Sequence, residues 1–199
     1  MSDSRLKMQD PRSQYPKPPF KPQHQSQTGL AKEMNPQPDH GETSYVGAGK
    51  LKGRKALVTG ADSGIGRAVA IAFAREGADV AISYLPSEEV DAKEVVKLIE
   101  KSGVKAFAIP GDIQHESFCQ QLVTRAEKDL GGLDILVNNA GTMSSHTDIL
   151  DITTADFDKT VKTNIYALFW ITKAAIPLPK ELLSNTKARK RSWRASVAE

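Results

Sequence analysis

The feature that most constrains this chain is a glycine-rich run, Thr59–Gly66, with the sequence TGADSGIG. It follows a short apolar run of strand-forming residues, 56–58, and opens a helix-like segment, 67–74. A strand that turns through glycines into a helix presents backbone N–H groups to an anion. Glycine is needed because a Cβ would block both the tight turn and the approach of a pyrophosphate. The run therefore predicts a nucleotide-binding turn, and an ordinary β–α turn is the alternative.

Strand-like and helix-like segments alternate through residues 51–177. Short apolar runs predict strands at 55–59, 79–84, 105–110 and 133–138, and apolar residues at helical spacing lie between them. A fourth helix is expected over about 154–175, apolar around most of its surface. Continuous apolar strands are typical of a parallel sheet covered by helices on both faces. The pattern predicts an α/β, Rossmann-type doubly wound sheet of about four strands, which is an incomplete version of that fold.

Two segments flank this domain. Residues 1–50 form a polar leader with seven of the eleven prolines, and such a composition predicts an extended or disordered segment, with wrapping around the domain or an intersubunit arm as alternatives. After residue 177 the apolar pattern stops, and residues 178–199 form a basic tail. We expect this tail to be an aberrant continuation, produced by a frameshift or a premature stop.

Further motifs follow the glycine-rich run in a fixed order. The third apolar run ends in Gly111-Asp112-Ile113, the fourth ends in the sequence NNAG (138–141), and the last helix carries Asn164. Together these motifs resemble the short-chain dehydrogenase/reductase family, in its bacterial type with a Pro/Gln-rich leader. The resemblance covers roughly residues 51–177. It implies an NAD(P)-dependent oxidoreductase that transfers hydride between a nicotinamide and a carbonyl or alcohol.

The resemblance also implies which residues contact the cofactor. The glycine-rich turn would hold the pyrophosphate, Asp112 and Ile113 would border the adenine, and the NNAG residues would line the ribose, where a side chain would crowd it. For Asp112 a turn or N-cap role is the alternative, and Asn139 is as readily a tie between strands. The expected cofactor-binding residues are Gly60, Ala61, Asp62, Ser63, Gly64, Ile65, Gly66, Tyr84, Asp112, Ile113, Asn138, Ala140 and Gly141.

The end of the second predicted strand bears on the choice between NAD and NADP. An NAD site usually has an acid there, which binds the ribose 2′-OH and repels a 2′-phosphate. Tyr84 occupies that place, and no arginine follows it at once. The nearest base in the glycine motif is Arg67, for which a solvated helix position is the alternative. The sequence therefore favours NADP over NAD as the cofactor.

The proton-transfer residues of the family are missing. Family members use a Tyr-x-x-x-Lys pair, because a phenol with a pKa near 10 needs a cationic neighbour to act near neutral pH. None of the four tyrosines here has lysine four positions later. Only Asn164 matches the catalytic set, with a buried structural role as its alternative. We expect the chain to be inactive alone, and the alternative function is a non-catalytic nucleotide-binding remnant or interaction protein.

Other classes of function find little support. Cys119 is the only cysteine and the four histidines show no metal-ligand spacing, so no metal site is expected. No apolar run approaches the roughly 18 residues of a membrane span, which favours a cytoplasmic protein. The net charge of +3 comes from the tail, and the remainder is nearly neutral, so nucleic acid is not an expected partner despite Trp193. A homo-oligomer is compatible with the apolar fourth helix.

Overall fold

The computed structural model describes residues 10–25 and 31–176, and the tail predicted at 178–199 lies outside them. Four parallel strands form one sheet in the order β3-β2-β1-β4. Their bounds are β1 (Lys55–Thr59), β2 (Asp79–Tyr84), β3 (Ala106–Pro110) and β4 (Ile135–Val137). The predicted α/β fold with a parallel sheet of four strands is confirmed for the described residues. Among the described strands β4 pairs with β1 alone, so it forms an edge of the sheet in this part of the chain.

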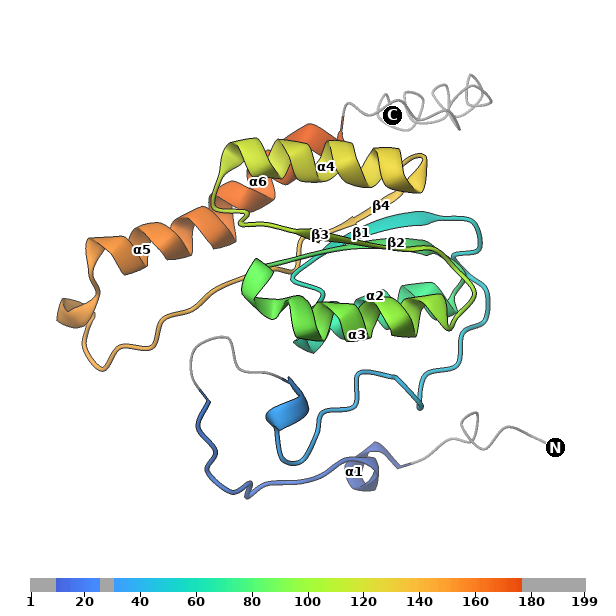
Figure 1. The fold of residues 1–199 in the computed structure, drawn as a ribbon. Helices are drawn as coiled ribbons and strands as arrows, with labels where there is room; N and C mark the ends of the chain where they lie inside the picture. The colour runs from blue at the N-terminus through green and yellow to red at the C-terminus, as the bar shows by residue number, and fades with distance from the viewer. Residues whose placement is uncertain (1–9, 26–30, 177–199) are drawn as a thin grey trace, which may run out of the picture.

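Helices cover both faces of the sheet (Figure 1). One face carries α2 (Gly64–Arg75) and α3 (Glu89–Glu100), and the other carries α4 (Glu116–Leu130) and α6 (Ala167–Ala175). Each strand contributes side chains alternately to the two faces. Leu57 belongs to the core under α4 and α6, whereas the next residue, Val58, belongs to the core under α2 and α3. Both side chains are fully buried.

The last predicted helix is not one regular α-helix. It consists of α5 (Thr154–Val161), a π-helical segment (Lys162–Tyr166) and α6. A π-segment inside an α-helix often marks a functional site, and this one contains Asn164. The expectation of a single α-helix over 154–175 is therefore corrected at its centre.

The fourth strand is also shorter than predicted. Side chains and turn atoms take the backbone hydrogen bonds at both of its ends. Before it, the carboxylate of Asp134 accepts the N–H of Lys55 at 3.0 Å. After it, the N–H groups of Asn139 and Ala140 both donate to the hydroxyl of Thr59, at 3.1 Å each. The strand pairing consequently stops at Val137.

The side chain of Asn139 completes a junction between β1 and β4. Its amide nitrogen donates to the carbonyl oxygens of Thr59 and Gly60, at 2.9 Å each. The hydroxyl of Thr59, in turn, lies 3.3 Å from the carbonyl of Val137. The two strand ends are thus held by both side chains and backbone, and the glycine-rich turn begins from this fixed point.

The leader has little regular structure in its described part, as expected. It contains one helical turn, α1 (Pro11–Gln14), and a short 3₁₀ segment (Ala31–Glu33). Residues 42–50 nevertheless lie against α2 and the turn after it. The carboxylate of Glu76 accepts the hydroxyl of Tyr45 and the N–H groups of Ala48 and Lys50. These contacts hold residues 42–50 against the domain, and wrapping was one of the alternatives considered for the leader.

A buried ion pair joins the leader to the two helices on its side of the sheet. The guanidinium of Arg67 on α2 contacts Glu42 of the leader and Glu94 of α3, each at 2.9 Å. Arg67 is only 5% exposed. It is therefore neither the solvated helix residue nor a cation available to a cofactor phosphate, the two roles considered for it from the sequence.

Acid should weaken the attachment of the leader. Burial alone would raise the pKa of Glu42, but hydrogen bonds from its own N–H and from His40 leave that pKa lowered from its ordinary value of 4.5. A lowered pKa means that the carboxylate stabilises the fold above its unfolded-state pKa, and that this contribution disappears as the pH falls through the folded-state pKa. We expect Glu42→Gln to lower the melting temperature at pH 7, and to lower it by less at pH 3. An equal loss at both pH values would contradict the ion-pair explanation.

Removing the hydroxyl of Thr59 should destabilise the junction of β1 and β4. In Thr59→Val the buried N–H of Ala140 loses its hydroxyl partner, which costs about 1–3 kcal/mol. Because about 1 kcal/mol shifts the melting temperature of a chain this size by roughly 2–4 °C, calorimetry can resolve the loss. Thr59→Ser keeps the hydroxyl and is the matched control. A larger loss in the serine variant would show that the methyl group, not the hydrogen bonds, is what matters.

Candidate functional site

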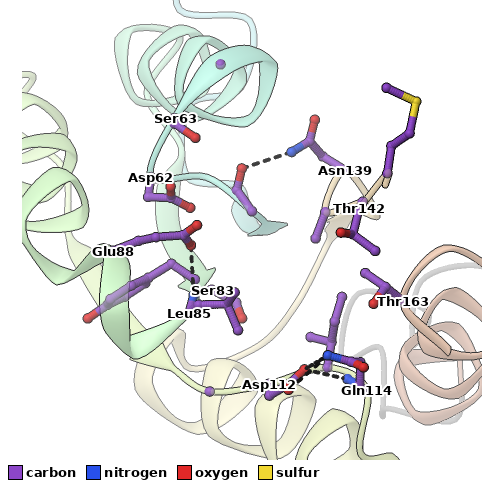
Figure 2. A pocket seen from close by; sticks show the side chains of 18 of the residues that line it. Asp62, Ser63, Ser83, Leu85, Glu88, Asp112, Gln114, Asn139, Thr142 and Thr163 are labelled. Carbon is purple, nitrogen blue, oxygen red and sulfur yellow. Dashed lines mark hydrogen bonds between the residues drawn. The ribbon is translucent and has the colours of Figure 1, made fainter. Parts of the chain in front are cut away.

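A cavity of about 500 Å³ opens at the carboxyl ends of the four strands (Figure 2). Each strand contributes to its lining: Gly60 follows β1, Tyr84 ends β2, Gly111 follows β3 and Ala140 follows β4. In doubly wound sheets, ligands bind in the crevice beyond these ends, where the strand order reverses. Here the reversal lies between β1 and β4, beside the junction made by Thr59 and Asn139.

The turn after β1 needs glycine at two positions. Gly60 has a positive φ of 60°, and a Cβ there would lie 2.9 Å from the Cα of Ala140. At Gly66 a Cβ would lie 2.1 Å from the carbonyl oxygen of Gly60 and 2.5 Å from the amide nitrogen of Asn139. These separations are too short for any side chain, so the first turn of α2 packs directly on the junction. The glycine spacing is thereby explained by contacts within the protein itself.

The start of α2 is suited to an anion. Ser63 is the N-cap residue, yet no described side chain accepts the N–H groups of the first turn. Gly64 and Ile65, in the first turn of the helix, both line the cavity. Unpaired N–H groups and the positive end of the helix dipole together favour a phosphate. Ala61 and Gly66 belong to the same turn, but they pack beneath it rather than line the cavity.

Another wall of the cavity comes from the loop after β3. Asp112, Ile113 and Gln114 all line it. The carboxylate of Asp112 accepts the N–H of Gln114 at 2.9 Å and its side-chain amide at 3.1 and 3.2 Å (Figure 2). The turn role considered for Asp112 is therefore present. A carboxylate has about four acceptor positions, so one remains available for a ligand donor.

A corner of the cavity is acidic. Asp62 from the glycine-rich turn and Glu88 from the 3₁₀ segment after β2 (Pro86–Glu88) both line it. Burial raises the pKa of Asp62, and the charge of Asp91 adds to that rise. Burial also raises the pKa of Glu88, with the charge of Asp62 as the next cause. The two carboxylates therefore act on each other electrostatically.

Tyr84 contributes its ring rather than its hydroxyl. The side chain is 4% exposed, and its hydroxyl donates to Glu89 at 2.5 Å. Burial raises the pKa of Tyr84, and this hydrogen bond raises it further. A phenol held in its protonated form this firmly is a poor acid or base near neutral pH. Tyr84 can therefore bound the cavity without taking part in proton transfer.

The two asparagines after β4 point in opposite directions, as successive residues of an extended chain do. Asn139 lines the cavity and holds the glycine-rich turn. The structure places Asn138 outside the lining, with its amide donating to the hydroxyl of Thr172 on α6 at 3.0 Å. The strand-tying role considered for Asn139 is thus present, whereas a cofactor contact of Asn138 finds no support in this geometry.

Asn164 holds the loop beyond the NNAG sequence. Its side-chain oxygen accepts the N–H of Thr142, and its nitrogen donates to the carbonyl of the same residue, both at 2.8 Å. Asn164 itself does not line the cavity, but Thr142 and Thr163 do. In this structure the asparagine fixes the shape of the wall. A proton-relay role for it stays a prediction.

Most of the expected cofactor residues meet at this cavity, and several lining residues were not predicted. Ala61, Gly66 and Asn138 are the expected residues that do not line it. The polar residues that sequence reasoning missed are Ser83, Glu88, Gln114, Thr142, Ser144, Lys159 and Thr163. For Lys159 and Thr163 a signal existed, since residues four apart on a helix share a face. No sequence pattern indicated Glu88, because it reaches the cavity only through the 3₁₀ turn that brings the chain back to the end of β2.

Within residues 10–25 and 31–176, no helix combines the length and apolar character that crossing a bilayer requires.

Comparisons with known proteins agree with the parallel sheet and the glycine-rich turn. The family model of the short chain dehydrogenases matches residues 54–188. Uncharacterized oxidoreductase YghA of Escherichia coli is 55% identical over 171 residues, which are 86% of this chain and 58% of that protein. Glucose and ribitol dehydrogenase of Daucus carota is 37% identical over 81% of this chain and 58% of its own length.

Solved structures agree with these matches. A short chain dehydrogenase from Burkholderia cenocepacia, in complex with NADP, is 43% identical with a TM-score of 0.61, over 63% of this chain and 51% of that one. A blue fluorescent protein from a metagenomic library, in complex with NADPH, is 36% identical with a TM-score of 0.59, over the same shares. The chain spans less than two thirds of the length of these relatives. The glycine-rich turn, the sheet and the matched sequence show that the chain belongs to the short-chain dehydrogenase/reductase family of oxidoreductases, which use NAD(P).

Proposed function

We propose that this chain binds a nicotinamide dinucleotide in the cavity at the carboxyl ends of its strands. The observation that carries the proposal is the uncapped start of α2, whose residues Gly64 and Ile65 line the cavity beside a turn that has no room for a side chain at Gly60 or Gly66. The NADP and NADPH complexes of two related structures support it. In the whole protein the reaction would be hydride transfer between the nicotinamide and a small carbonyl or alcohol.

The residues of this chain account for binding and orientation. The N–H groups of Gly64 and Ile65 would bind the pyrophosphate, with Ser63 as a further donor, because these residues line the cavity. Ile113 offers an apolar contact to a base, and Gly141 leaves room beside the ribose. The nicotinamide, when bound, supplies or accepts the hydride. The loop fixed by Asn164 would bound the reacting end of the cavity.

Proton transfer is a different matter. No tyrosine of the sequence is followed by lysine four positions later, and the tyrosine at the cavity has a raised pKa. We therefore propose that this polypeptide by itself binds the dinucleotide without reducing or oxidising a substrate. The alternative function, a nucleotide-binding protein that acts through partners, shares the binding step and differs in the use made of the bound dinucleotide. A cytoplasmic location stays a prediction.

Titration of the purified chain with NADH and NADPH, monitored by nicotinamide fluorescence, tests the proposal. We expect saturable binding and no substrate-dependent change in absorbance at the nicotinamide band with small aldehydes, ketones or sugars. Binding with turnover would overturn the second part of the proposal. Absence of binding by a folded chain would overturn both parts.

A substitution at Gly141 locates the binding site. A Cβ there would lie 3.5 Å from the side-chain oxygen of Asn164, an ordinary contact, so Gly141→Ala should keep the melting temperature. Because the new methyl group enters the cavity wall, we expect about a tenfold loss of dinucleotide affinity, or ~1.4 kcal/mol. Unchanged affinity would place the ligand elsewhere.

We also propose that the chain forms a homo-oligomer through the outer surface of α5 and α6. Phe157, Ile165 and Phe169 are each at least 60% exposed there, and they follow one another at helical spacing. Large apolar groups gathered in this way usually mark an interface. Sedimentation velocity should show an assembly larger than the 21.7 kDa chain, shifted toward monomer in Phe169→Ser. A monomer at all concentrations would contradict this.

A further inference from the structure

Two carboxylates from different elements meet at one corner of the cavity. Asp62 lies in the glycine-rich turn and is 4% exposed, and Glu88 ends the 3₁₀ segment after β2. Glu88 is held in place by the N–H of Leu85, which donates to its carboxylate at 3.1 Å. Figure 2 shows both carboxylates on the same side of the cavity, beside Ser83 and Leu85 at the end of β2. Neither group has an ion-pair partner among the described residues.

This corner is where a dinucleotide of this fold places its adenosine ribose. The ribose lies beyond the end of the second strand, next to the glycine-rich turn, where a single acid commonly accepts the 2′-OH. In the sequence that place is taken by Tyr84, which carries no negative charge, is 4% exposed and donates its hydroxyl hydrogen to Glu89. The structure brings two acids to the same corner from positions outside the strand end.

Cations that could offset a 2′-phosphate are distant from this corner or already paired. Arg67, the nearest base in sequence, is buried between Glu42 and Glu94 and does not line the cavity. Among the described lining residues Lys159 is the one cation. It lies on α5, one turn before Thr163, which Figure 2 shows across the cavity from Asp62 and Glu88.

We propose that Asp62 and Glu88 select the unphosphorylated adenosine ribose, so that this chain binds NAD in preference to NADP. The proposal rests on the proposed dinucleotide binding and adds its specificity. Carboxylates accept hydrogen bonds from the ribose hydroxyls, whereas a 2′-phosphate would bring a charge of about −2 against two like charges in a partly buried site. The preference for NADP inferred from the sequence rested on the strand end, and two related structures hold NADP or NADPH. In this chain Asp62 and Glu88 add a negative charge at the corner that the strand end lacks.

Direct binding measurements on the full chain test this without any turnover. We expect NADH to bind at least about 30-fold more tightly than NADPH in low salt, with the difference shrinking as salt screens the charges. Glu88→Gln keeps an oxygen to accept the N–H of Leu85, and Asp62→Asn keeps the shape of the turn. Each should strengthen NADPH binding by about tenfold, which corresponds to ~1.4 kcal/mol of relieved repulsion.

A matched control and distinct outcomes make the result decisive. Glu100→Gln removes the same charge from the exposed end of α3, outside the cavity, and should leave the NADH-to-NADPH ratio unchanged. Equal binding of NADH and NADPH by the native chain, or tighter NADPH binding, overturns the selectivity and leaves the proposed function intact. Binding of neither by a folded chain, as judged by circular dichroism, overturns both. The ratio in the native chain needs no variant, so misfolding of a variant cannot hide the answer.

Discussion

The hydrogen bonds between Thr59 and the residues after β4 determine the shape of everything at the carboxyl edge of the sheet. Thr59 accepts two backbone N–H groups from the neighbouring strand's continuation, and Asn139 returns two hydrogen bonds to the carbonyls of Thr59 and Gly60. Buried polar groups have to be paired, and here each satisfies the other. The residues that follow β4 therefore fix the glycine-rich turn that follows β1, although some 80 residues separate the two segments in sequence.

From that fixed point the charge distribution of the cavity is set. The turn brings the first residues of α2, Gly64 and Ile65, to the lining of the cavity, and an uncapped helix start favours phosphate. The same turn carries Asp62, and the return of the chain after β2 adds Glu88, which makes the adjoining corner unfavourable for phosphate. A ligand that is anionic in its middle and uncharged at its sugar matches this pattern. The leader also affects the charge of the cavity. Its Glu42 pairs with Arg67, the one arginine of the glycine motif, and this pair lies outside the cavity lining.

Features that depend on neighbouring residues were predictable, and features that depend on distant ones were not. The positions of the strands and the helix that the glycine-rich run opens result from apolar runs and glycines that are local in sequence. Asn138 and Asn139 point in opposite directions because they occupy opposite faces of the extended chain. No local sequence pattern indicated which of the two would line the cavity. The burial of Arg67 required knowing where the leader would lie. The π-segment around Asn164 depends on the contact of its side chain with a loop 22 residues earlier.

The described part of the chain also separates two tasks physically. Phosphate binding at a helix start uses backbone N–H groups and needs no titrating side chain. Proton transfer rests on a phenol whose pKa is lowered by a nearby cation. The one phenol at this cavity is in the opposite situation, because burial and the carboxylate of Glu89 both raise its pKa. The hydroxyl of Tyr84 donates to Glu89, so the same hydrogen bond that orders this wall of the cavity also keeps the phenol in its protonated form.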